Sequence, residues 1–79
     1  MGVKFMDINI DKELKELAER IKKRREELNL SYEDLEKRTG IKKSTLKKYE
    51  TRADNIPLNK FKTLSEGLEI EPDKLMGWC

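Results

Sequence analysis

The chain has 79 residues, a length that suits one small domain with a limited core. Hydrophobic residues make up 35% of the sequence and charged residues 43%, so the core must come from narrow apolar stripes on amphipathic helices. No run approaches the roughly 20 apolar residues that a membrane span needs, and no secretory signal is visible, which favours a cytoplasmic protein.

The sequence holds no histidine, and its single cysteine, Cys79, is the last residue. The commonest metal ligand and the usual general base at neutral pH are therefore missing, as is any disulfide framework. We expect no metal site, no cofactor and no enzymatic activity. Residues 1–10 form an N-terminal extension, and its many apolar side chains predict packing against the domain or a partner.

A first helix is predicted from about Asp11, a good N-cap, to Leu28, with Asn29 as its stop. Its apolar side chains form one stripe: Ile10, Leu14, Leu17, Ala18, Ile21 and Leu28. Arg25 falls inside that stripe, so its guanidinium needs a carboxylate or a path to the surface. Glu50 is the expected partner. Its position favours a partly buried pair over an exposed pair that would contribute less than about 1 kcal/mol.

Two short helices around a tight turn are predicted in the middle of the chain. Ser31 and Asp34 have the spacing of a capping box, and Gly40 can take the left-handed conformation that ends a helix. The second helix runs from about Lys42 to Thr51. Stepping about 100° per residue places Leu46 and Tyr49 on its buried side. The opposite face carries Lys43, Ser44, Lys47, Lys48 and Thr51.

Five basic residues against one acidic residue lie between Lys42 and Arg52. Such a concentration of positive charge has two readings, a solvated lysine face or a surface that binds a polyanion. Further along, a helix starting near Pro57 is predicted to bury Leu58, Phe61, Leu64 and Leu68. A short last helix, opened by Glu71-Pro72-Asp73, closes the bundle with Leu75, Met76 and Trp78.

Several of these residues carry a family resemblance. They are Leu30, Ser31 and Leu35 in the first short helix, Gly40 and Ile41 at the turn, and Ser44, Thr45, Leu46, Tyr49 and Glu50 in the second. Ile56-Pro57-Leu58 and residues 68–78 extend the match. The chain thus resembles the Cro/repressor-type (XRE-like) helix-turn-helix family of phage and bacterial transcription regulators. The resemblance implies an all-α, compact five-helix bundle over residues 11–78, lambda-repressor-like, with residue 79 at a boundary.

The resemblance also implies the role of each site residue in a repressor that binds double-stranded DNA. The second short helix would enter the major groove with Lys43, Ser44, Lys47 and Lys48 towards base edges. Phosphates would be met by Ser31, Tyr32, Thr51 and Arg52, and a salt bridge between Arg25 and Glu50 would hold the helix in place. Lys42 stands where the family usually has a serine or threonine cap.

Family members usually pair across a twofold axis, which implies a homodimer on a palindromic operator. The candidates for that contact are Ile56, Leu75, Met76 and Trp78, although Trp78 could equally close the core. A second hypothesis keeps the helix-turn-helix but gives it a protein partner, as in an antitoxin or antirepressor-binding module. Steep weakening of binding with salt would distinguish DNA from an apolar partner.

Overall fold

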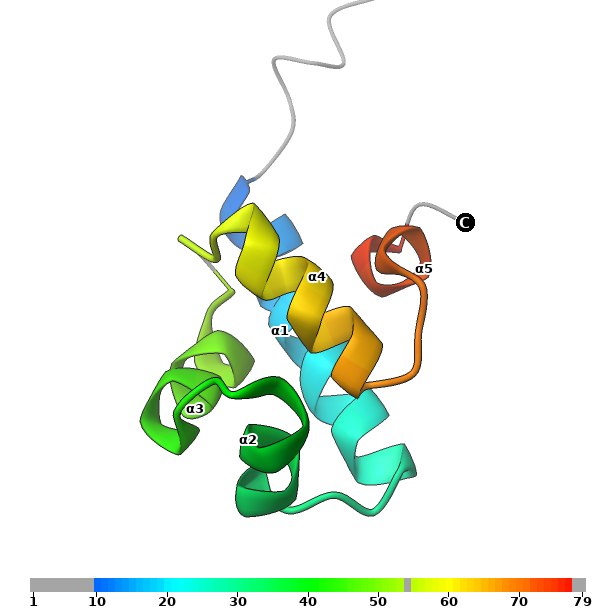
Figure 1. Ribbon diagram of the computed structural model, residues 1–79. Coiled ribbons are helices and arrows are strands. Elements are labelled where there is room, and N and C mark those ends of the chain that lie inside the picture. Colours follow the sequence, from blue (N-terminus) through cyan, green and yellow to red (C-terminus); the bar gives the residue numbers. More distant parts are fainter. Residues whose placement is uncertain (1–9, 54, 78–79) are drawn as a thin grey trace, which may run out of the picture.

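The computed structural model describes residues 10–53 and 55–77, so the proposed roles of residues 1–9, Trp78 and Cys79 lie outside the described residues. Five helices and no strand occupy this part of the chain, which confirms the predicted all-α class (Figure 1). Their bounds are Ile10–Glu27 (α1), Tyr32–Thr39 (α2), Lys43–Thr51 (α3), Leu58–Gly67 (α4) and Pro72–Met76 (α5). Among the described helices, none is both long enough and apolar enough to cross a membrane.

The core lies between α1 and the four shorter helices. α3 and α5 pack on α1, α2 packs on both α3 and α4, and α4 also contacts α5. Figure 1 shows α1 passing behind α4, with α2 and α3 grouped at one end of the bundle. Among the described residues, the largest side chains buried to less than 2% exposure are Ile21, Leu35, Leu46, Leu64, Ser65, Leu68 and Leu75.

The connections that follow α1 and α4 each contain a residue of left-handed backbone. Asn29 has a φ of 57°, and Glu69 after α4 has a φ of 56°. The amide of Leu30 donates to the carbonyl of Arg25, and the amide of Ile70 donates to that of Ser65, each over 3.1 Å. These are the hydrogen bonds of Schellman caps, so both helices end with their last carbonyls satisfied. Asn29 was the predicted stop, whereas α1 starts at Ile10, one residue before the predicted cap.

Three arginines hold the carboxyl ends of α4 and α5 against the rest of the bundle. Arg24 donates from Nε to the carbonyl of Leu68 over 2.8 Å and from Nη2 to that of Glu69 over 2.9 Å. Arg20 donates to the carbonyl of Met76, and Arg38 to that of Gly67. Cations are favoured at helix C-termini, so these three arginine side chains stabilise the packing of the helices within the domain.

The prediction that Leu58 belongs to the core is wrong. Leu58 is 82% exposed, although the pattern placed it with Phe61, Leu64 and Leu68 on the buried side of α4. At about 100° per residue, Leu58 stands at the edge of the face that those three side chains define. As the first residue of α4, it therefore projects outward and leaves an apolar side chain at the surface.

Gly67 marks the closest approach of α4 to α2. A methyl group on Gly67 would lie 2.5 Å from Cγ2 of Thr39. Thr39 cannot easily turn away, because its hydroxyl donates to the carbonyl of Leu35 over 2.8 Å and accepts from the amide of Ile41 over 3.1 Å. The side chain that would clash is thus held in place from both sides.

We expect Gly67→Ala to lower the free energy of unfolding by about 1 to 3 kcal/mol, the usual cost of overpacking. Alanine is normally the better helix former by about 1 kcal/mol, so the expected sign is opposite to that of an exposed site. Urea unfolding followed by circular dichroism measures the change. Adding Thr39→Ser, which removes the clashing methyl and keeps the hydroxyl, should restore stability. A Gly67→Ala variant as stable as the parent would contradict the close packing.

Candidate nucleic-acid interface

The turn between α2 and α3 is built by local capping. Ser31 Oγ accepts from the amide of Asp34 over 3.0 Å, and Asp34 accepts from the amide of Ser31 over 3.1 Å. The hydrogen bond from the Ser31 amide holds the pKa of Asp34 below its ordinary value. Gly40 ends α2 with a φ of 75°, as predicted. α3 follows after Ile41 with Lys42 as an N-cap that makes no side-chain hydrogen bond.

α3 presents opposite faces to the core and to solvent. Leu46 is fully buried and Tyr49 is 8% exposed, so these two side chains attach the helix to the bundle. The outward face carries Ser44, Lys47, Lys48 and Thr51, all exposed, with Lys43 half-buried. Lys47 and Lys48 form no ion pair with any described residue. This face therefore keeps positive charge available to a partner.

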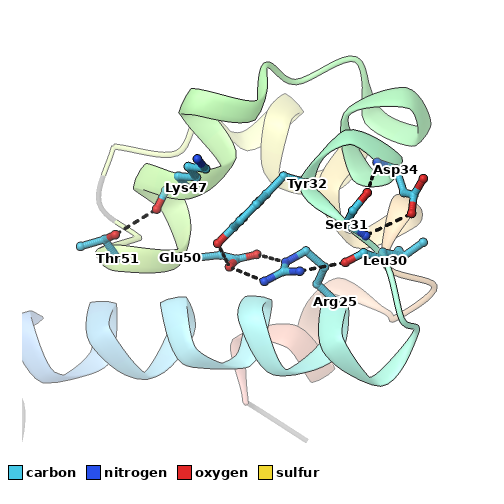
Figure 2. Close-up of polar contacts among 8 residues, drawn as sticks. All are labelled: Arg25, Leu30, Ser31, Tyr32, Asp34, Lys47, Glu50 and Thr51. Atoms are coloured by element: carbon cyan, nitrogen blue, oxygen red, sulfur yellow. Dashed lines mark hydrogen bonds and ion pairs between the residues drawn. The ribbon is translucent and has the colours of Figure 1, made fainter.

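A buried ion pair fixes α3 to α1. Arg25 Nε lies 2.7 Å from Glu50 Oε2, and Arg25 Nη2 lies 3.2 Å from Oε1 (Figure 2). The two side chains are only 11% and 3% exposed. Arg25 also donates from Nη1 to the carbonyl of Leu30 over 2.8 Å. The structure thus brings together the two residues that the sequence suggested as partners.

Tyr32 completes this cluster. Its hydroxyl donates to Glu50 Oε1 over 2.9 Å, and the guanidinium of Arg25 sits 4.2 Å from the ring centroid. Burial, and then the hydrogen bond to Glu50, raises the pKa of Tyr32, so the phenol keeps its proton at neutral pH. The sequence analysis had proposed Tyr32 as a phosphate contact, whereas in the structure its O–H is donated to Glu50.

The same ring also supports the outward face of α3. Lys47 Nζ lies 5.5 Å from the centroid of Tyr32, within the range of a cation–π contact. In Figure 2 the tyrosine side chain reaches from α2 towards α3 and ends with its hydroxyl at Glu50. One aromatic residue of α2 thereby contacts both the buried anchor and the exposed cation of α3.

Two of the other proposed phosphate contacts, Thr51 and Arg52, lie at the end of α3. Lys47, Lys48, Thr51 and Arg52 line a shallow depression of about 390 Å³. Thr51 is exposed, and its hydroxyl donates to the carbonyl of Lys47 over 3.0 Å. Two proposed base contacts and two proposed phosphate contacts are thus neighbours.

A second ion pair joins α2 to α3 and was missed in the sequence. Lys43 Nζ lies 3.0 Å from Glu33 Oε2. Both residues are partly exposed, so this contact stands at the surface next to the proposed base-reading side chains. The two residues are ten positions apart and lie on different helices, so the spacing of residues within one helix could not predict the contact. It depends on the angle between α2 and α3.

Of the described residues proposed for the dimer contact, two line a surface groove and one is buried in the core. Ile56 and Met76 line an apolar groove of about 600 Å³, together with Leu14, Leu17, Ala53, Asn55, Leu58, Phe61, Pro72 and Asp73. Leu75 is fully buried in the core and is not available to a partner, which removes it from the candidates. Leu58, which the sequence analysis had placed in the core, is exposed and lines the groove, so it becomes a candidate for the dimer contact.

The fold and this surface define a helix-turn-helix protein, and comparison with known proteins agrees. A family model described as helix-turn-helix matches residues 21–75. The chain belongs to the Cro/repressor-type helix-turn-helix family and is a DNA-binding regulator.

A crystal structure of the restriction-modification controller protein C.AhdI from Aeromonas hydrophila is similar, with a TM-score of 0.74 and 29% sequence identity. The match covers 78% of this chain and 94% of that one. No curated protein matches the chain significantly.

Proposed function

We propose that this protein is a transcriptional repressor that inserts α3 into the major groove of double-stranded operator DNA. The observation that carries the proposal is the outward face of α3, where Lys47 and Lys48 form no ion pair with any described residue and the helix itself is anchored by a buried ion pair. The major groove is about 12 Å wide and admits an α-helix. Rigid attachment matters because base readout depends on side chains held within a fraction of an ångström.

The proposal assigns roles along the face. Lys43, Ser44, Lys47 and Lys48 approach base edges, where a lysine can donate to O6 and N7 of guanine. Ser31 and the first amides of α2 approach one phosphate, because a helix N-terminus favours anions. Thr51 and Arg52 approach another. Tyr32 contributes by supporting Lys47 and by orienting Glu50.

The protein is proposed to act as a homodimer on a palindromic site, because one small domain reads few bases and half-sites about 34 Å apart identify an operator. The apolar groove is the proposed contact with the second copy. Ala53, which lies two residues after the end of α3, is one of the residues that line this groove. A dimer contact at the groove would therefore place the α3 helices of the two copies near each other. Leu58, exposed at the rim, would be buried by the partner.

Leu58→Lys should convert the dimer to a monomer, because it places a charge in a desolvated apolar contact. Sedimentation velocity measures the change in oligomeric state. Leu58 is already 82% exposed, so the free energy of unfolding of the monomer should hardly change. Asn59→Lys, one residue further along the exposed start of α4 and outside the lining, is the matched control. An unaltered dimer in Leu58→Lys would exclude this groove as the interface.

Selection of bound oligonucleotides from a random pool tests the DNA-binding proposal. A palindrome with half-sites one helical turn apart is the expected result, and repression of a reporter carrying that site would assign the direction of regulation. The similarity to a restriction-modification controller supports a role in transcription control, which takes place in the bacterial cytoplasm. Recovery of no preferred sequence, with salt-insensitive binding to a protein, would favour the antitoxin or antirepressor-binding alternative.

A further inference from the structure

Glu33 lies in the first turn of α2, beside the first residue of α3. Its carboxylate is bound to Lys43 at 3.0 Å, although the glutamate side chain is 62% exposed and the lysine side chain 44%. Lys47 and Lys48 have no such carboxylate among the described residues. One of the cations proposed to read bases is therefore occupied by an anion of the same protein, at the edge of the surface that meets DNA.

Both members of this pair are charged at neutral pH. The hydrogen bond from Lys43 lowers the pKa of Glu33, and the same bond raises the pKa of Lys43. A DNA phosphate that approaches Lys43 must displace the carboxylate and also tolerate its negative charge. A guanine edge offers two neutral acceptors to the ammonium and does not carry the charge that the carboxylate repels. The pair thus weakens a phosphate contact more than a base contact.

We infer that Glu33 is a specificity-determining residue, which withholds Lys43 from DNA phosphates and leaves it to a base edge of the correct site. The inference rests on the proposed DNA-binding function and deepens it. Discrimination by a DNA-binding protein is the ratio of its affinities for the correct site and for other DNA. A carboxylate that reduces the second affinity more than the first raises that ratio without any contact of its own to a base.

Glu33→Gln tests this inference, with binding measured by fluorescence anisotropy on the selected operator and on a scrambled duplex of equal length and composition. Affinity for the scrambled duplex should rise about fivefold, and its salt dependence should steepen by about one counterion, because a lysine becomes available to phosphate. Affinity for the operator should rise by less than about twofold, so the specificity ratio falls. Glu19→Gln, which removes the same charge from an exposed position of α1, should change neither affinity appreciably.

A double-mutant cycle distinguishes two effects of Glu33: its pairing with Lys43, and a direct repulsion between its carboxylate and the DNA phosphates. Lys43→Gln should weaken binding to the scrambled duplex more in the Glu33→Gln background than in the parent protein, where the lysine is already occupied. Equal gains on both duplexes, or strictly additive effects of the two substitutions, would overturn the inference while leaving DNA binding intact. If the parent protein binds neither duplex, the proposed function fails, and this inference fails with it.

Discussion

Glu50→Ala is expected to lower the free energy of unfolding by about 3 to 5 kcal/mol, the usual cost of removing one partner from a buried ion pair. The substitution leaves the Arg25 guanidinium charged, at a site where its side chain is 11% exposed in the parent protein, with only the carbonyl of Leu30 as an acceptor in the cluster. The hydroxyl of Tyr32 loses its acceptor as well. Urea and thermal unfolding followed by circular dichroism measure the loss.

A matched control is available within α1. Glu16→Ala removes the same charge from a pair with Arg20 that spans 3.7 Å and is more than one third exposed at both ends. Its expected cost is about 0.5 kcal/mol or less, since exposed pairs are screened by solvent. Arg25→Met combined with Glu50→Leu should be far more stable than either single variant, because no buried charge remains unpaired. Equal stability of Glu50→Ala and Glu16→Ala would refute the anchoring role of the pair.

Replacing Lys43, Lys47 and Lys48 together by glutamine is expected to weaken operator binding by about 100-fold near 0.1 M salt. The estimate follows from about 1 kcal/mol for each lysine that meets a base or phosphate. The dependence of affinity on salt should fall by about one counterion for each lost phosphate contact. Anisotropy titrations at several salt concentrations give both quantities, and circular dichroism should show an unchanged fold, because the side chains stand outside the core.

The matching control removes the same number of positive charges from α1 instead of α3. Lys15→Gln, Lys22→Gln and Lys23→Gln remove three exposed cations from α1 and should change operator affinity by less than about fivefold. Lys48→Ala alone should relax base preference at one operator position. A similar loss of affinity from the α1 and α3 triple variants would mean that net charge, rather than the face of α3, controls binding.

Sequence reasoning predicted those parts of the fold that local chemistry determines. The capping box of Ser31 with Asp34 and the left-handed Gly40 are formed by neighbouring residues, so their spacing is sufficient to predict them. Arg25 could be paired with Glu50 because a permanent charge inside an apolar stripe demands a carboxylate, and the family resemblance implied which one.

The errors concern positions that only tertiary packing decides. Leu58 follows the helical period of α4, yet the start of that helix lies at the edge of the core, and no periodicity shows where a core ends. Leu75 was expected to close the bundle and was also a dimer candidate; its full burial is compatible only with the first of these roles. The contact of Glu33 with Lys43, and the hydroxyl of Tyr32 on Glu50, depend on the angle between α2 and α3.

Amide chemical shifts during titration with the selected duplex test the central claim most directly. If α3 is the surface that meets DNA, shifts will concentrate in residues 43–52 and at the start of α2, near Ser31 and Tyr32. Residues of α4 and α5 away from the apolar groove will change little. Absence of any shift in dilute buffer, or shifts restricted to α4 and α5, would contradict the account.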